Sequence, residues 1–376
     1  MDRIRDAIGI PPITEHDGLG ILVAIVDTGV DLEHPDLAEA VDVHRSEVFT
    51  LDGELLDANG HGTHVAGIIA GAGIAGPRYR GMAPRVRLVI CKALGSDGKG
   101  ASSNVAAAIV HAADVGAHII NLSVGRTALE IARGHAPWVW STHRSVTEEA
   151  VAYASERGVL CVCAAGNGGP HAGSVELPGA LEEALSVGYL DRAGLVAEAS
   201  ARGPFFRSDT LGPGEVIHTD GALPDLPAMP YLKPDVVAPG GSGRTTYSLY
   251  AEMGVDVDGV VATRSRRGHM RPVSALEADL RYARCSGSSQ AAAVVSGLAA
   301  LTLDYSKARG LELGKNQGRS LANLLRASAD AAGLGRDTDC GHGCLSWRRV
   351  KDTVDGCIEN PAVRERILAG SAPLLL

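Results

Sequence analysis

Aromatic residues are scarce in this chain of 376 residues, because Phe, Trp and Tyr together make up only 4% of it. Few side chains are therefore available to stack on nucleic-acid bases. The formal net charge of −9 also disfavours binding to a phosphate backbone, which requires an excess of basic side chains. We therefore expect no nucleic-acid partner.

Long apolar runs are missing as well. No stretch approaches the ~20 apolar residues that a membrane helix needs. The start Met1-Asp2-Arg3-Ile4-Arg5-Asp6 lacks the apolar centre of a secretory signal. We therefore expect no membrane partner and a cytoplasmic location.

The cysteines do not form an even set that would indicate a disulfide framework. Seven are scattered over the chain, so at least one must be unpaired. Cys91, Cys161 and Cys163 stand in apolar runs, which indicates buried packing residues. The Cys-Gly-His-Gly-Cys run at 340–344, with Cys357 beyond it, leaves two alternatives open: a zinc site, or buried or paired cysteines.

Apolar runs and helical stretches alternate along the chain. Continuous apolar runs, each typical of a strand buried on both faces, occupy residues 21–26, 87–93, 118–124, 159–165 and 184–190. Residues 102–116 and 145–157 have the apolar period of helices, and the second stretch opens with the capping box Ser145-x-x-Glu148. This order predicts an α/β fold with a mostly parallel sheet covered on both sides by helices.

Polar residues and glycines follow several of the predicted strands. The first strand ends in Asp27-Thr28-Gly29, and the fourth is followed by Asn167-Gly168-Gly169. In a parallel sheet the carboxyl ends of the strands meet at one edge, where binding residues collect. We therefore expect the functional site at this edge.

Each motif taken alone has an ordinary explanation. His61 and His64 open an apolar helix, but their spacing is three and the Glu of a His-Glu-x-x-His zinc motif is missing. We interpret His64 as a hydrogen-bonded structural residue. Asp27-Thr28-Gly29 is similar to the triplet of aspartic proteases, but these need two such carboxylates and the chain has one triplet. The serines at 286–289 precede an apolar helix and could simply cap it.

Taken together, four motifs in a fixed order resemble the subtilisin-like serine proteases. They are Val23-Ala24-Ile25-Val26-Asp27-Thr28-Gly29, His61-Gly62-Thr63-His64-Val65-Ala66-Gly67, Ala164-Ala165-Gly166-Asn167-Gly168-Gly169 and Gly287-Ser288-Ser289-Gln290-Ala291. The order Asp, His, Ser is that of subtilisin. Four motifs in one order are far more specific than any one of them, and the likeness extends from about residue 20 to residue 354.

The resemblance implies a subtilisin-like three-layer α/β/α domain over residues 20–357. An N-terminal extension, residues 1–19, precedes this domain, and a C-terminal tail, residues 358–376, follows it. Two stretches inside the domain, about 205–231 and 241–282, are rich in Gly, Pro and charge, so we expect long surface excursions there.

The resemblance also implies a serine endopeptidase that hydrolyses peptide bonds. Ser289 would be the nucleophile, His61 its general base, and Asp27 the residue that orients the imidazole. Asn167 would donate its side-chain amide to the oxyanion. A peptide or protein substrate would bind in extended form along residues that the family uses for this purpose. These are Leu122, Ser123, Val124, Gly125, Gly98, Gly100, Ala165 and Gly166.

Some positions depart from the family pattern. Ser288 replaces the usual Thr before the nucleophile and Gln290 the usual Met after it, but neither is a triad member, so Ser289 stays the predicted nucleophile. Arg126 stands where relatives usually have Gly. It could crowd the groove, recognise an acidic substrate residue, or face solvent.

The resemblance leaves metal binding and control open. Asp36 matches a calcium ligand of the family, but the loop 71–80 lacks the Asn expected there, so we expect no required cofactor and do not assume a calcium ion. Only about twenty residues precede the first strand, too few for the inhibitory pro-domain of secreted relatives. We therefore expect control by a regulatory protein partner. The alternative function is a protease-fold binding or scaffold protein whose groove is obstructed.

Overall fold

The computed structural model describes residues 1–12, 14–125, 145–203, 232–242, 258–269, 279–334 and 337–370. Within these ranges a seven-stranded sheet has the order β2-β3-β1-β4-β5-β6-β7, and all of its neighbouring strands are parallel. The strands are β1 (Leu22–Asp27), β2 (Glu47–Val48), β3 (Arg87–Lys92), β4 (Ile119–Leu122), β5 (Leu160–Ala164), β6 (Ala184–Leu190) and β7 (Val236–Pro239). The predicted parallel sheet is confirmed.

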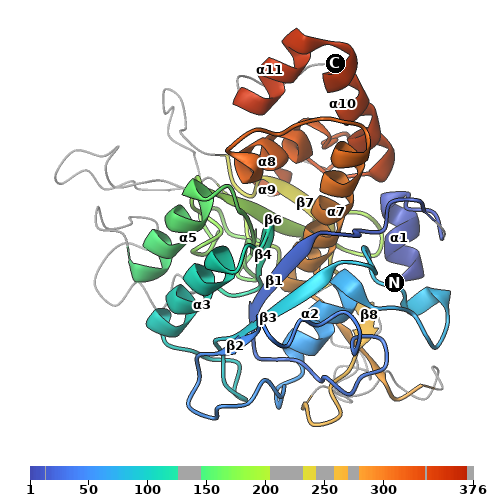
Figure 1. Cartoon of the computed structure of the whole chain (residues 1–376). Coiled ribbons are helices and arrows are strands. Elements are labelled where there is room, and N and C mark those ends of the chain that lie inside the picture. The colour runs from blue at the N-terminus through green and yellow to red at the C-terminus, as the bar shows by residue number, and fades with distance from the viewer. Residues whose placement is uncertain are drawn as a thin grey trace.

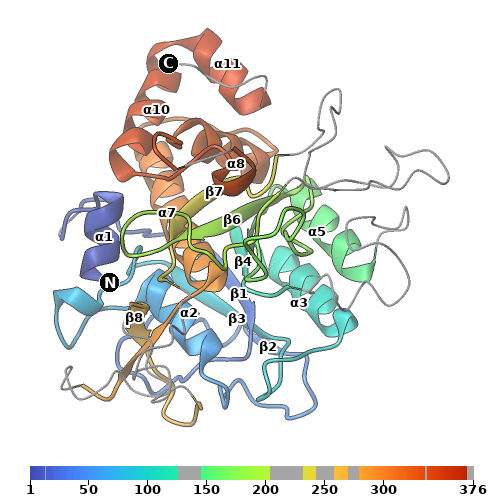
Figure 2. The same ribbon diagram turned by 180° about the vertical axis from the view of Figure 1, so that it is seen from behind.

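Helices cover both faces of the sheet, as Figures 1 and 2 show. On one face lie α3 (Ser102–Asp114) and α5 (Val146–Glu156), and on the other α2 (His61–Ala70), α7 (Ser288–Ala308) and α8 (Gln317–Ala327). Alternate strand residues point to opposite faces, so Val23 and Ile25 join one hydrophobic core, and Ala24 and Val26 join the other. The three-layer α/β/α architecture is therefore also confirmed.

The remaining elements surround these layers. They are α1 (Asp2–Ile8), the 3-10 helix η1 (Pro77–Tyr79), the antiparallel hairpin of β8 (Val260–Thr263) and β9 (Tyr282–Cys285), α9 (Asp337–Cys340), α10 (Trp347–Glu359) and α11 (Pro361–Ala369). The hairpin packs against α2 and forms part of the second predicted excursion. The first predicted excursion lies outside the described residues. No helix described here has the length and apolar character needed to cross a membrane.

Local sequence explains where α5 begins and ends. The backbone N–H of Ser145 donates to the Glu148 carboxylate at 2.8 Å, as the predicted capping box requires. The helix stops before Gly158, whose φ of 77° is easily reached only without a side chain.

The cysteines predicted to be packing residues are buried. Burial raises the pKa of the Cys91 and Cys161 thiols to about 12, so both stay protonated at neutral pH. No disulfide joins any of the seven cysteines, all of which lie in the described ranges. In the same ranges no group of three or more His, Cys, Asp or Glu side chains is placed to hold a metal ion.

Candidate active site

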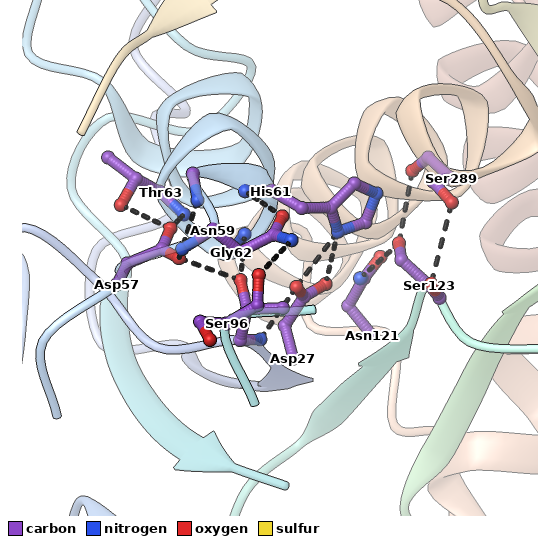
Figure 3. A network of polar contacts seen from close by, with 12 residues as sticks. Asp27, Asp57, Asn59, His61, Gly62, Thr63, Ser96, Asn121, Ser123 and Ser289 are labelled. Carbon is purple, nitrogen blue, oxygen red and sulfur yellow. Dashed lines mark hydrogen bonds and ion pairs between the residues drawn. The ribbon is translucent and has the colours of Figure 1, made fainter. Parts of the chain in front are cut away.

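The four residues predicted to act together are brought to one edge of the sheet. Asp27 ends β1 and Asn167 follows β5, whereas His61 opens α2 and Ser289 is the second residue of α7. In Figure 3 the ring of His61 lies between Asp27 and the start of α7, where Ser289 stands. The strand ends and helix starts thus converge where the parallel sheet predicts a site.

Asp27 and His61 form a close pair in which the carboxylate is buried and the ring is half-buried. The Asp27 side chain is 0% exposed, and its two carboxylate oxygens lie 2.8 and 2.9 Å from Nδ1 of His61. Because an ionised carboxylate can only accept, Nδ1 must carry the proton that is shared with it. The neutral ring therefore has its lone pair at Nε2, on the side away from Asp27. This is the tautomer that a general base requires.

The surroundings shift the proton affinity of His61 upward. Burial disfavours the charged ring, but the negative charge and hydrogen bond of Asp27, with a further contribution from the charge of Asp57, outweigh it and raise the pKa of His61 above 6.5. The ring therefore takes up a proton readily at its second nitrogen. It becomes a neutral base only when the pH exceeds this raised pKa.

Asp57 organises the start of α2, a role that the sequence analysis missed. Its Oδ1 accepts hydrogen bonds from the Thr28 hydroxyl (2.8 Å) and the Gly60 N–H (2.7 Å). Its Oδ2 accepts from the N–H and the hydroxyl of Thr63, at 2.8 and 2.7 Å. The Thr28 hydroxyl in turn accepts from the Gly62 N–H at 2.9 Å. The signal for this role was an acid just before a predicted helix start, a position that favours capping.

Ser289 is held next to the end of β4. The Ser123 hydroxyl donates to the Ser289 carbonyl oxygen at 3.1 Å, and Asn121 donates its amide to that same hydroxyl at 2.8 Å. The Ser289 hydroxyl donates to the Ser123 carbonyl oxygen at 3.4 Å. Within the described residues no hydrogen bond joins Ser289 to His61. In substrate-free proteins such contacts are often long, and a serine side chain turns readily between staggered rotamers.

Asn167 lies at the other side of the α7 start with its amide oxygen engaged. Its Oδ1 accepts from the Ser288 N–H at 2.9 Å and from the Ser288 hydroxyl at 3.1 Å. These donors identify the bonded atom as the oxygen, which leaves the amide NH₂ directed elsewhere. Asn167 is exposed, so this NH₂ is accessible to a ligand.

A groove of about 980 Å³ runs past His61. Of the residues predicted to bind substrate, five line it: Gly98, Gly100, Ser123, Val124 and Gly125. The other three, Leu122, Ala165 and Gly166, are buried. Leu122 pairs with strands on both sides, so its backbone offers no edge to which a substrate strand could be added. Arg126 lies outside the described residues.

His64 has the structural role that was expected. Its Nε2 lies 3.1 and 3.2 Å from the carbonyl oxygens of Val260 and Ala283, so the ring joins α2 to the β8–β9 hairpin. Burial, with the nearby charge of His61, lowers the pKa of His64 to about 4. It is therefore neutral at the pH where His61 would work.

Comparisons with known proteins agree with this geometry. A family model described as the subtilase family matches residues 18–343. The chain is 36% identical to a thermophilic serine proteinase of Bacillus sp. (strain AK1) over 51% of this chain and 43% of that protein, and 37% identical to a subtilisin of Bacillus sp. (strain TA39) over 50% and 44%. It thus spans less than half the length of these curated relatives. The solved structure of Sphericase is 29% identical, with a TM-score of 0.62 over 92% of this chain and 97% of that one.

The pKa of His61 should fall when Asp27 is replaced by Asn. The substitution removes the charge that outweighs burial, so the neutral ring becomes favoured. The ring proton shifts of His61, followed by NMR as a function of pH and assigned with a His61→Gln variant, measure this change. Asp97→Asn, which removes the charge of an exposed acid next to Gly98 of the groove, serves as the control. An unchanged His61 titration in Asp27→Asn would contradict the electrostatic role of Asp27.

Proposed function

The chain belongs to the subtilase family, and from this premise we propose that it is a serine endopeptidase whose catalytic triad is Asp27, His61 and Ser289. The observation that carries the proposal is the close contact of the buried Asp27 carboxylate with the His61 ring beside the start of α7. The buried carboxylate orients the ring, and the raised pKa of His61 suits a group that must accept a proton during the reaction.

In the first half of the reaction, Ser289 Oγ attacks the carbonyl carbon of the peptide bond while its proton passes to Nε2 of His61. The tetrahedral intermediate then collapses, the C–N bond breaks, and His61 gives the proton to the departing amine. The products of this half are a free amine and an acyl ester on Ser289. Asp27 keeps its charge throughout and stabilises the imidazolium.

In the second half, water replaces the amine. His61 takes a proton from the water as its oxygen attacks the ester carbon, and the same proton then returns to Ser289 Oγ as the ester bond breaks. The carboxylic acid product leaves, and the enzyme is restored. One water is consumed for each peptide bond.

Negative charge develops on the carbonyl oxygen in both halves. We assign its stabilisation to the side-chain NH₂ of Asn167 and the backbone N–H of Ser289. Support for this role comes from the amide oxygen of Asn167, which is held by Ser288 and so turns the NH₂ outward. The partial positive charge at the N-terminus of α7 acts in the same direction.

Asp36 is proposed to be a structural hydrogen-bond acceptor instead of a calcium ligand. Its Oδ1 accepts from the Ile74 N–H at 2.8 Å, and its Oδ2 accepts from the Tyr282 hydroxyl at 2.9 Å. Each carboxylate oxygen of Asp36 therefore already has a hydrogen-bond partner within the protein. The rings of Tyr282 and Tyr79 stack at 3.7 Å beside this contact. These contacts support a structural role for Asp36, which joins the segment at Ile74 to Tyr282 without any metal ion.

A fluorophosphonate probe should label Ser289 and no other serine. Labelling of the wild type, its loss in Ser289→Ala and its retention in Ser286→Ala are expected, together with a loss of about 10⁶-fold in peptide hydrolysis by Ser289→Ala. Intact-mass spectrometry of the folded proteins measures the label. An unlabelled wild type would overturn the enzyme assignment and support the binding or scaffold alternative.

Replacing Asn167 by Ala should lower kcat by about 10²–10³-fold, the usual effect of losing one oxyanion donor. Because Asn167 also holds Ser288, an Asn167→Asp variant separates the two roles. Aspartate retains the acceptor for Ser288 but cannot donate, so it should be as impaired as alanine. Recovery of activity in Asn167→Asp would instead indicate a purely structural role.

Calcium should have no effect on thermal stability. We expect the same Tm in excess calcium and in EDTA, measured by calorimetry, because the hydrogen bonds from Ile74 and Tyr282 already hold both carboxylate oxygens of Asp36 in place. Tyr282→Phe should lower the free energy of unfolding by about 1 kcal/mol through loss of one such bond. A Tm that rises by several degrees on addition of calcium would refute the assignment of Asp36.

A further inference from the structure

We propose that Asn121 is a positioning residue for the nucleophile and acts on Ser289 through the hydroxyl group of Ser123. This inference rests on the proposed peptidase function. It adds a residue that cannot touch the substrate, because Asn121 is 0% exposed. Asn121 belongs to β4, and Figure 3 shows its amide directed at Ser123, which in turn faces Ser289.

An amide is an unexpected side chain at this place in the sheet. Asn121 pairs with Ile25 of β1 on one side and with Val162 of β5 on the other. Both neighbours belong to the hydrophobic core on the face that α7 covers. Paired residues of parallel strands point to the same face, so the amide enters this apolar layer. Burying it costs stability unless its polar atoms are bonded, which indicates a role that an aliphatic residue could not fill.

Three hydrogen bonds that run in one direction connect Asn121 to the nucleophile. The hydroxyl of Ser296, which is completely buried on α7, donates to Oδ1 of Asn121 at 2.9 Å. Nδ2 of Asn121 donates to Oγ of Ser123 at 2.8 Å. The Ser123 hydroxyl then donates to the carbonyl oxygen of Ser289 at 3.1 Å. We call these three bonds the serine–amide relay.

The chemistry of the amide sets the direction of the relay. An amide nitrogen only donates, so the Ser123 oxygen that accepts from it keeps its own proton for the Ser289 carbonyl. If the amide turned over, its oxygen would face Ser123 and draw that proton away from Ser289. Turning over would also take from the buried Ser296 hydroxyl the oxygen to which it donates. The relay therefore favours the orientation in which Ser123 is bonded to Ser289.

The relay fixes the first turn of α7 from the side of β4. From the other side, Oδ1 of Asn167 accepts from the N–H of Ser288 at 2.9 Å. Ser289 is thus held between two segments, and its Cα carries both the nucleophilic Oγ and the N–H proposed to stabilise the oxyanion. A displacement of a reacting group by about 1 Å can cost about 10²-fold in rate. The relay therefore acts on the rate of attack and leaves substrate affinity unchanged.

Exchanging the buried polar pair for apolar residues tests the proposal. A double variant, Asn121→Leu with Ser296→Ala, removes both partners of one buried hydrogen bond, so its Tm should stay close to that of the wild type. Its kcat for a peptide should nevertheless fall about tenfold with KM unchanged, because the Ser123 hydroxyl is no longer directed at Ser289. Calorimetry and steady-state kinetics measure these values. A folded double variant with the kcat of the wild type would overturn the role of Asn121.

Two single hydroxyl deletions on α7 form a matched pair. Ser296→Ala should lower kcat by about threefold, because the Asn121 amide loses the bond that orients it. Ser306→Ala removes another completely buried hydroxyl of the same helix, outside the relay, and should leave kcat unchanged. This pair decides the question if Asn121→Leu does not fold. Equal kcat values in the two variants would contradict the proposal.

The route through Ser123 has its own test. If Asn121 acts through the Ser123 hydroxyl, the apolar exchange should cause no further loss of kcat in a Ser123→Ala background. Effects that multiply would show that Asn121 does not act through this hydroxyl, and the proposal would fail.

The fluorophosphonate probe separates this inference from the proposed function. A labelled wild type, with the double variant labelled at the same rate, overturns the role of Asn121 alone. Slower labelling of the double variant, with an unchanged Tm, is the result we expect. A folded wild type that is not labelled overturns the peptidase function and this inference with it.

Discussion

The buried charge of Asp27 is the constraint on which the rest of the site depends. A carboxylate with no exposed surface costs several kcal/mol unless its partners satisfy it, and here the partners are the Thr28 N–H at 2.7 Å and Nδ1 of His61. Because β1 lies between β3 and β4, the backbone that holds Asp27 cannot move without disturbing the centre of the sheet. The carboxylate is therefore fixed, and His61 must come to it. The position of α2 follows from this requirement.

The start of α2 is fitted to the end of β1 with almost no free space. A Cβ atom at Gly62 would lie 2.3 Å from the Gly29 carbonyl oxygen, so only glycine allows His61 to approach Asp27 this closely. Asp57 ties the same turn together through Thr63, as Figure 3 shows, and its Oδ1 also accepts a hydrogen bond from the Thr28 hydroxyl. Sterics thus set how near the helix can come, and the hydrogen bonds of Asp57 set its orientation. The His61 ring is preorganised by both before any substrate arrives.

The sequence predicts the parts of this protein that obey a local period or a motif, and it misses those that depend on contacts between distant segments. The strand at 184–190 coincides with β6, and the capping box at Ser145 is present, because each depends on residues adjacent in the chain. The role of Asp57 was not predicted, since it becomes visible only when Thr28 and Thr63 lie against its carboxylate. Leu122 was expected to meet the substrate, but it is an interior strand residue, a fact that the order of strands in the sheet decides.

The scarcity of aromatic residues has a structural counterpart in α7, the helix that supports Ser289, the proposed nucleophile. This helix of 21 residues runs through one hydrophobic core, and small residues such as Ala291, Ala292 and Ala293 are completely buried along it. At Gly297 a Cβ atom would lie 2.4 Å from the Met82 side chain, so the helix packs as closely as its backbone allows. Large side chains would hold the helix farther from the sheet. The position of Ser289 against β4 and Asn167 is therefore set by packing along the whole helix. The loop before the helix contributes only the turn at Gly287.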